Sequence, residues 1–245
     1  MCGAAIDLPD DEVQLWHVDP DGVTHPDVLD RYRRMLSADE HRRYARYKLE
    51  KVRHQFLVTR GLVRTTLSAY GGLEPAAWRF ECNEFGRPEV VNFPGPKPFR
   101  FNLSHSDGCI VCAVAWQCDL GVDVEYVDRR TGGPHLAQRF FASSEVDDLL
   151  ALPPSEQRRV FFDYWTLKEA YIKARGKGLA IPLDQFAFVL RRDKPIRIEC
   201  HAELCDEPAD WQFMQFDLSA RHRVALAVRR GAGCNRHLIV RQFQP

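Results

Sequence analysis

A helix pattern followed by a strand pattern occurs twice in this sequence, and that order constrains the fold more than any other feature. Residues 27–70 show helical periodicity, and strands are then expected near 78–93 (strand-turn-strand), 99–104, 109–116 and 122–126. After a polar loop the order repeats, with helices at about 136–151 and 156–175 and strands at 186–191, 196–203, 211–218 and 223–230. This order predicts an α+β fold of two similar-sized halves, residues 1–117 and 118–245.

Balanced charge and an ordinary composition narrow the class of protein. The 245 residues include 34 Lys and Arg against 34 Asp and Glu, so no excess charge points to a nucleic-acid partner. Basic residues nevertheless outnumber acidic ones between Arg31 and Arg64, and such a segment could meet an anion. No apolar run approaches the roughly 18 residues that a membrane-spanning helix needs, so we expect no membrane segment.

The eight cysteines indicate a reducing compartment rather than a disulfide framework. Their spacing is irregular, and the first residues, MCGAAIDLPDDEVQ, lack the basic and apolar regions of a secretion signal, so we expect a cytoplasmic protein. Cys109 and Cys112 form a C-x-x-C pair inside an apolar strand-like run, where residues three apart point to opposite faces. Buried structural thiols are therefore favoured over a zinc site or a redox pair.

Two carboxylates share one face of the strand expected at 122–126. Asp123 and Glu125 are two residues apart, which at roughly 3.3 Å per residue places their Cα atoms about 6.5–7 Å from each other. Both side chains could converge on one ion, but the solvated acidic face of an amphipathic strand would give the same short pattern. The pair alone therefore decides little.

A third carboxylate lies on the apolar stripe of the helix expected at 156–175. Glu169 fills the position between Trp165 and Ile172, where a charge is costly unless it is paired or bound to a metal ion. A salt bridge to Lys173, four residues on, would explain the charge but not its place on the buried side of the helix.

Three carboxylates that face one another must be offset by protons or by a cation. If Glu169 faces Asp123 and Glu125, their oxygens suit a hard ion, and Mg²⁺ in particular tends to share its coordination with substrate phosphates. Lys168 and Lys173 would then supply positive charge for a phosphate partner. These residues predict metal-assisted chemistry on a phosphate compound.

A serine and a histidine stand where the strand at 99–104 runs into a Ser-Asp-Gly turn. Ser104 and His105 could hold a phosphate at the end of this strand, although a histidine in such a place often bonds only its own loop. No G-x-S-x-G motif accompanies them, so they do not indicate a Ser-His-Asp hydrolase. The sequence also contains no P-loop and no G-x-G-x-x-G motif.

Three motifs occur in an order that resembles the 4′-phosphopantetheinyl transferase superfamily, of the larger Sfp type. They are Asn102-Leu-Ser-His105, Gly121-Val-Asp-Val-Glu125 and Trp165-Thr-Leu-Lys-Glu-Ala-Tyr-Ile-Lys173, followed by the tail Gly176-Lys-Gly-Leu-Ala-Ile-Pro182. The pairing of G-[VI]-D with W-[ST]-x-K-E-[AS]-x-x-K is specific, and here Asp123 and Glu169 are 46 residues apart. The resemblance extends over roughly residues 40–190.

The resemblance implies an enzyme that transfers 4′-phosphopantetheine from coenzyme A to a serine of an apo acyl or peptidyl carrier protein, releasing adenosine 3′,5′-bisphosphate. It also implies two pseudo-symmetric halves, each with helices packed on a small, mostly antiparallel sheet, and an active site between them. By motif position, Asp123, Glu125 and Glu169 would hold Mg²⁺, or Mn²⁺, on the pyrophosphate. Glu169 and Lys173 would be catalytic, with either Glu169 or a metal-bound water as the base for the serine.

Motif position also assigns contacts to coenzyme A. Of these contacts, Arg87-Pro88 would line the adenine, and Arg53 would hold the 3′-phosphate, with Arg46 and Lys48 as alternatives. The implied contacts are Arg46, Lys48, Arg53, Arg87, Pro88, Ser104, His105, Lys168 and Lys173.

The carrier protein and the alternatives to transfer complete the interpretation. We predict that Arg129 and Arg130, just after the metal strand, dock an acidic carrier at the mouth of the cleft, with a merely solvated loop as the alternative. We expect a monomer. A coenzyme A-binding module without transfer chemistry, or a metal-dependent phosphoesterase, would use the same residues, and turnover with an apo carrier protein would distinguish them from a transferase.

Overall fold

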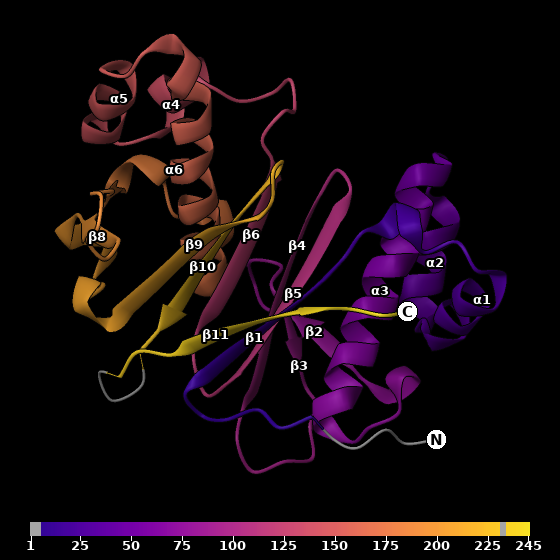
Figure 1. Ribbon diagram of the computed structural model, residues 1–245. Helices are drawn as coiled ribbons and strands as arrows, with labels where there is room; N and C mark the ends of the chain where they lie inside the picture. The colour runs from indigo at the N-terminus through magenta and orange to yellow at the C-terminus, as the bar shows by residue number, and fades with distance from the viewer. Residues whose placement is uncertain (1–5, 231–233) are drawn as a thin grey trace.

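The computed structural model describes residues 6–230 and 234–245 and shows two helix-plus-sheet halves side by side (Figure 1). The predicted α+β class is confirmed. In the first half, helices cover one face of a sheet with strand order β11-β1-β5-β4. The elements up to the middle of the chain are β1 (Glu12–Val18), α1 (Pro26–Met35), α2 (Ala38–Arg46), α3 (Glu50–Gly71), β2 (Phe80–Cys82), β3 (Pro88–Val90), β4 (Phe99–Ser106) and β5 (Cys109–Trp116).

In the second half, helix α6 packs on a sheet with strand order β6-β10-β9, and β7 pairs with β8. All strand pairs of this half are antiparallel. The elements along the rest of the chain are β6 (Leu120–Tyr126), α4 (Pro134–Phe140), α5 (Ser143–Leu150), α6 (Pro154–Ala174), β7 (Phe186–Val189), β8 (Arg197–Cys200), β9 (Trp211–Ser219), β10 (His222–Arg229) and, in the sheet of the first half, β11 (His237–Gln242).

The helical regions are divided more finely than the sequence pattern predicts. The region at 27–70 contains three helices, and Ser37 caps α2, because Ser37 and Glu40 bond each other's backbone nitrogens at 3.2 and 2.8 Å. The helix predicted at 136–151 is two helices, since the backbone is extended at Phe141 and Ala142. Among the residues that the structure describes, no helix is both long and apolar enough to cross a membrane.

Two strands that were not predicted tie the ends of the chain together. β1 pairs in parallel with β11 on one side and antiparallel with β5 on the other. β11 therefore completes the sheet of the first half, although it follows the second half in the sequence. The division at residues 117 and 118 stays a prediction, and the last strand crosses it.

β5 carries the packing between the halves, because both of its faces are buried. Ile110 and Cys112 pack against the helices of the first half, whereas Cys109 and Val111 face the strands of the second sheet. The opposite orientation predicted for Cys109 and Cys112 is confirmed. Burial raises the pKa of both thiols to about 12, so neither ionises near neutral pH.

β4 and β6 lie along one another at the seam between the two sheets, joined by side chains instead of a backbone ladder. The side-chain oxygen of Asn102 accepts a hydrogen bond from the backbone nitrogen of Val122 at 2.9 Å. The hydroxyl of Ser106 accepts one from the nitrogen of Tyr126 at 2.8 Å. These contacts place the polar face of β4 directly opposite the carboxylates of β6.

Candidate active site

A close approach of α6 to β6 builds the site. At Gly121, a Cβ would lie 2.0 Å from the carbonyl oxygen of Ala170 and 2.5 Å from the nitrogen of Ala174. Only glycine permits the two backbones to come this close. The contact brings Glu169 and Lys173 of α6 up to the carboxylates of β6.

Asp123 is held at one oxygen only. Its Oδ1 accepts hydrogen bonds from Lys173 Nζ at 2.7 Å and from Ser104 Oγ at 2.8 Å, whereas Oδ2 is buried and has no hydrogen-bond partner among the residues that the structure describes. Lys173 also donates to Ser104 Oγ at 3.0 Å and to the carbonyl of Val122 at 3.1 Å. A buried oxygen without a hydrogen bond is costly, so Oδ2 is an open position for a ligand.

Glu125 is engaged at both oxygens. Its Oε1 accepts from Trp165 Nε1 at 2.9 Å, and its Oε2 lies 2.8 Å from Arg129 Nη1 and 3.4 Å from Ser106 Oγ. Burial, and next the negative charge of Asp123, raise the pKa of Glu125 to about 7.

Glu169 meets the same charges from the helix side. Burial, and next the charge of Asp123, raise its pKa to about 7, although Lys173 and Arg129 oppose the shift. Two neighbouring carboxyls with raised pKa values indicate a group of acids with too little countercharge around them. Asp123 thus acts electrostatically on both of the other predicted metal ligands, and we call these three residues the carboxylate cluster.

The cluster fits a divalent cation in its chemistry. Within residues 6–230 and 234–245, no three His, Cys, Asp or Glu side chains converge as a ready-made metal site, and Lys173 and Arg129 lie on the carboxylates. The open oxygen of Asp123 and the raised pKa values of Glu125 and Glu169 are what an added positive charge would relieve. Carboxylate oxygens are also the donors that Mg²⁺ prefers.

A cavity of about 350 Å³ opens beside this cluster, at the seam between the halves. Its lining contains four cationic side chains and no acidic one, and Lys173 belongs both to the lining and to the carboxylate cluster. Such a cavity suits a ligand with several negative charges. It is lined by Arg43, Arg60, Cys82, Phe85, Gly86, Arg87, Pro88, Asn102, Leu103, Lys173, Gly176 and Gly178.

Sequence comparisons connect this site to known proteins. The profile of the 4′-phosphopantetheinyl transferase superfamily matches residues 119–228, which include the whole carboxylate cluster. The 4′-phosphopantetheinyl transferase HetI of Nostoc sp. is 34% identical over 192 residues, covering 78% of this chain and 80% of that protein. The chain belongs to the 4′-phosphopantetheinyl transferase superfamily.

A second transferase is similar over most of the chain. The 4′-phosphopantetheinyl transferase Sfp of Bacillus subtilis is 33% identical over 170 residues, covering 69% of this chain and 73% of that protein. The solved holo-[acyl-carrier-protein] synthase of Thermotoga maritima matches with a TM-score of 0.37 and 23% identity, covering 49% of this chain and 64% of that one. The sequence identities to HetI and Sfp confirm the resemblance stated from the motifs.

Two arginines that the motif comparison missed line the phosphopantetheinyl transferase cavity. Arg43 of α2 and Arg60 of α3 lie over the ring of Phe56, with 5.6 and 5.1 Å between each guanidinium carbon and the ring centre. Glu40 Oε1 lies 3.5 Å from Arg60 Nε, but Glu40 also pairs with Arg64. The single carboxylate therefore offsets only part of the positive charge of the two cavity arginines, Arg43 and Arg60. Both lining arginines lie in the basic segment noted above, but the sequence does not show which of its members face the seam.

The residues predicted to hold the 3′-phosphate lie outside that lining. Arg46 and Lys48 are exposed. Arg53 pairs with Glu50 and lies over the ring of Tyr44, 5.8 Å from its centre. Because α3 begins at Glu50, Arg53 stands in the first turn and reaches back along its own helix, so its contact with the 3′-phosphate stays a prediction.

Lys168 also lies outside the cavity lining, and its contact with coenzyme A stays a prediction that its burial disfavours. The side chain is fully buried, with Nζ 2.7 Å from Glu145 Oε2 and donating to the carbonyls of Leu183 and Phe186 at 2.6 and 2.7 Å. Successive residues on a helix point about 100° apart, so Lys168 enters the second-half core while Glu169 faces the seam.

The other predicted coenzyme A contacts divide between the cavity and its surroundings. Arg87 and Pro88 line the cavity, and Arg87 Nη1 also donates to the carbonyl of Ala174 at 2.8 Å, which links the halves. Ser104 lies in the carboxylate cluster, whereas His105 is exposed and outside the lining. The contacts of these four residues with coenzyme A stay predictions.

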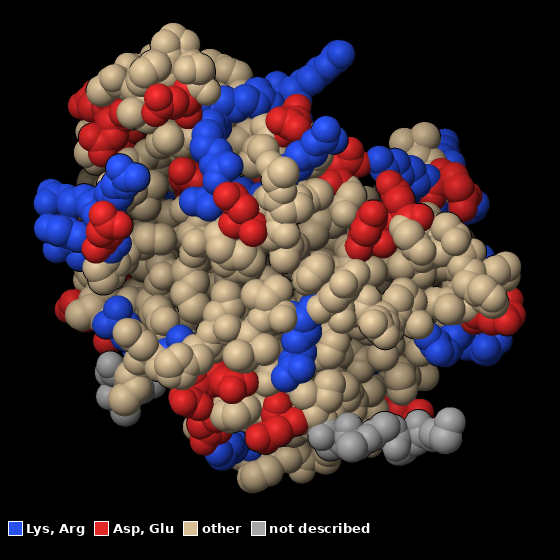
Figure 2. All heavy atoms as spheres, in the orientation of Figure 1, with Lys and Arg blue, Asp and Glu red and all other residues tan. Residues whose placement is uncertain are grey.

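The loop 127–133 follows β6 and borders the site. Figure 2 shows Lys and Arg atoms gathered over this loop and the nearby ends of β9 and β10. Arg130 is exposed, as a docking residue must be. Arg129, by contrast, pairs with Glu125 and lies over the ring of Phe162, 5.4 Å from its centre. Carrier docking stays a prediction for both arginines, and the geometry favours Arg130.

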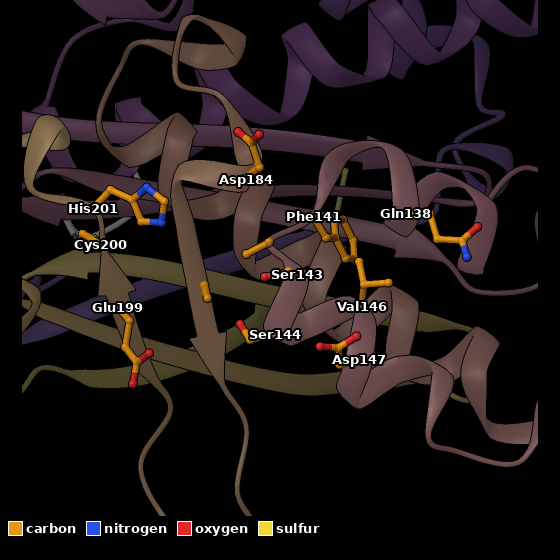
Figure 3. A pocket seen from close by; sticks show the side chains of 12 residues that line it. Gln138, Phe141, Ser143, Ser144, Val146, Asp147, Asp184, Glu199, Cys200 and His201 are labelled. Carbon is orange, nitrogen blue, oxygen red and sulfur yellow. The ribbon is translucent and has the colours of Figure 1, made fainter.

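The largest cavity described lies elsewhere in the second half. It measures about 710 Å³ and opens between α4–α5 and β7–β8 (Figure 3). Asp147, Asp184 and Glu199 are in its lining, which contains no Lys or Arg and none of the predicted site residues. Acidic walls disfavour a phosphate compound, so chemistry and not volume identifies the site.

Proposed function

We propose that this protein transfers the 4′-phosphopantetheine group of coenzyme A to a serine hydroxyl of an apo acyl or peptidyl carrier protein and releases adenosine 3′,5′-bisphosphate. The observation that carries the proposal is the union, through Lys173, of a cationic cavity and a three-carboxylate cluster at the seam. Membership of the superfamily supplies the reaction class.

Coenzyme A would enter the cavity as an anion along a row of cations. Arg43 and Arg60, at the α2–α3 end, would take the 3′-phosphate, because charge-assisted bonds from guanidinium groups suit phosphate oxygens. Arg87 and Pro88 would border the adenine. Lys173 would meet the pyrophosphate, since it lies between the cavity and the carboxylates.

Asp123, Glu125 and Glu169 would hold Mg²⁺, with Mn²⁺ as the alternative. When bound, the ion offsets the charge that grows on the pyrophosphate in the transition state and aligns it for in-line attack. The ammonium of Lys173, 2.7 Å from Asp123 Oδ1, is placed to act on the same developing charge.

The transfer exchanges one phosphorus–oxygen bond for another. The serine oxygen attacks the phosphorus that carries pantetheine, and the bond from this phosphorus to the bridging oxygen breaks. Adenosine 3′,5′-bisphosphate leaves with the electron pair, and the serine proton passes to a base. Either Glu169, which stands at the cluster, or a water beside the cation would be this base.

A mass measurement tests the transfer. The protein is incubated with coenzyme A, Mg²⁺ and several apo carrier proteins, and each carrier is examined for the added mass of phosphopantetheine. Modification of a carrier at serine supports the proposal. Binding of coenzyme A without modification of any carrier would indicate a binding module, and hydrolysis of a phosphoester without a carrier would indicate a phosphoesterase.

Arg130 on the loop 127–133 would dock the carrier, whose surface in this family is expected to be acidic. Arg130→Glu should raise KM for the carrier and leave KM for coenzyme A unchanged, and added salt should shrink the effect because it screens exposed charges. An unchanged carrier KM at low salt would remove Arg130 from the docking surface and direct attention to the exposed ring of Phe140.

The proposal includes a division of labour between residues 1–117 and 118–245, a monomeric state and a cytoplasmic location. The first part would supply the cavity arginines and the second the metal ligands. Free thiols at Cys109, Cys112 and Cys118 fit a reducing compartment. Size-exclusion chromatography with light scattering would test the monomeric state.

A further inference from the structure

Arg129 lies where a counter-ion of the carboxylate cluster would lie. Its Nη1 is 2.8 Å from Glu125 Oε2, and its guanidinium carbon stands 5.4 Å from the ring centre of Phe162. Its Nε donates to the carbonyl of Thr131 at 3.1 Å. A side chain held by an ion pair, a ring and a backbone carbonyl is directed inward, unlike its exposed neighbour Arg130.

The loop that carries Arg129 is packed against α6. Gly132 has a φ of +133°, and a Cβ at this position would lie 2.9 Å from the ring of Phe162. Arg158 of α6 donates from Nε to the carbonyl of Val127 at 2.9 Å. The loop is therefore tied to the helix on both sides of Arg129, and these contacts hold the guanidinium over the cluster.

Asp123 and Glu125 differ in what an incoming cation would have to displace. Asp123 offers Oδ2, which is buried and has no hydrogen-bond partner. Both oxygens of Glu125 are taken, one by Trp165 and the other by Arg129. A cation that bridges the two carboxylates therefore meets an open oxygen on one and an arginine on the other.

We propose that Arg129 competes with the divalent cation for Glu125, so that binding of the cation loosens residues 128–131, between the two contacts that tie the loop to α6. The inference rests on the proposed function, which places the cation on Asp123, Glu125 and Glu169. It adds an order of events, because the segment with the docking residue Arg130 loosens only when the cation is in place.

Titration of the substrate-free protein with Mn²⁺ tests the competition, with calorimetry or the electron paramagnetic resonance of free Mn²⁺ as the measurement. Arg129→Gln and Arg130→Gln remove the same charge at adjacent positions. Competition predicts that Arg129→Gln binds Mn²⁺ about threefold to fivefold more tightly than the wild type, the scale expected for loss of a partly exposed ion pair. Arg130→Gln should stay within about twofold, because long-range charge effects are screened.

The sign of the change separates competition from damage. A loop that merely lost its packing would weaken Mn²⁺ binding, so weaker or unchanged binding by Arg129→Gln overturns the inference. Arg129→Lys, which keeps the charge, should bind Mn²⁺ nearly as the wild type does. Tightening by the lysine variant equal to that of the glutamine variant would also overturn it, because the removed charge would then not be the cause.

Asp123→Asn distinguishes failure of this inference from failure of the proposed metal site. If the variant binds Mn²⁺ as the wild type does, the carboxylates are not the site and both ideas fall. If it loses Mn²⁺ while Arg129→Gln shows no tightening, only the competition is wrong.

Limited digestion with trypsin measures the release of the loop directly. Cleavage after Arg130 should become faster when Mn²⁺ is added to the wild-type protein, because the freed loop is a better substrate. Cleavage at other sites gives the control within the same sample. An unchanged or slower rate after Arg130 at saturating Mn²⁺ would contradict release.

Discussion

Helix α6 directs a lysine toward buried carboxylates of other elements on each of two faces, and the two arrangements differ in how completely the charges are satisfied. On the core face, Glu145 accepts from Lys168 and from the backbone nitrogens of Phe188 and Ala142, at 2.7, 2.8 and 3.1 Å. The two side chains are fully enclosed and every oxygen of the acid is used. Such a network fixes the position of a helix.

On the seam face, the carboxylates have fewer hydrogen-bond and ion-pair partners than their oxygens could accept. Lys173 serves Asp123 at one oxygen, the other oxygen is unpartnered, and Glu169 has its pKa raised to about 7 by burial and by Asp123. The comparison teaches that a buried charge with a full set of partners is structural, whereas one left incomplete is available to a ligand. One face of α6 thus stabilises the position of the helix, and the other face contributes residues to the candidate active site.

The largest effect is expected on transfer activity when a carboxylate of the seam face is removed. Asp123→Asn should lower transfer by about 10³-fold or more, because it removes a ligand of the ion that stabilises the pyrophosphate charge, while the fold persists. Turnover with an apo carrier protein and circular dichroism measure the two outcomes. EDTA should have a comparable effect on the wild type, and near-normal turnover in either case would remove the metal from the mechanism.

Breaking the core face should act on stability instead. Lys168→Met leaves Glu145 buried without its cation and should lower the free energy of unfolding by about 3–5 kcal/mol, measured by denaturant titration. The double variant Lys168→Met with Glu145→Leu should recover more than half of this loss, because no buried charge remains. A stable single variant with weakened coenzyme A binding would instead return Lys168 to the coenzyme A site.

The cavity arginines give a smaller effect that sharpens the assignment of the 3′-phosphate. Arg60→Ala should raise the Kd for coenzyme A by about tenfold and reduce the preference over dephospho-coenzyme A, since a charge-assisted bond is lost. Arg53→Ala is the matched control on the same helix and should stay within about twofold. If Arg53→Ala alone reduces the preference, the motif-based assignment was right and the cavity-based one wrong.

The smallest effect is a pH dependence of the metal-free protein. Burial raises the pKa of Glu169 from 4.5 to about 7, so the folded state binds this proton more tightly than the unfolded chain does. The resulting stability is present below pH 4.5 and is lost as the pH rises through 7. The melting temperature in EDTA should therefore fall by a few degrees between about pH 5 and 7.5.

Glu169→Gln is the control for this pH dependence. It should flatten the fall in melting temperature, because glutamine cannot titrate, and Mg²⁺ should reverse the fall in the wild type at neutral pH. A profile that is equally steep in the variant would assign the dependence to other groups, such as Glu125.

The carboxylate cluster could be predicted from the sequence because local rules determine it. Strand alternation places Asp123 and Glu125 on one face, and the helical repeat places Glu169 on the inner side of α6. The same rules located the two-part α+β order and the opposite orientation of Cys109 and Cys112. These features depend on only a few neighbouring residues, so the pattern contains them.

The remaining features depend on which surfaces meet, and a linear pattern does not contain that information. Arg53 and Arg60 lie on one helix, yet only Arg60 reaches the cavity, because α2 and α3 pack around Phe56 in one particular way. β11 pairs with β1 although more than two hundred residues separate the two strands in the sequence, and a pattern of neighbouring residues does not predict such a pairing. Arg129 pairs with Glu125 because the loop packs against α6 and places the guanidinium over the cluster. The direction of such a long side chain depends on its tertiary contacts and not on its neighbours in the chain.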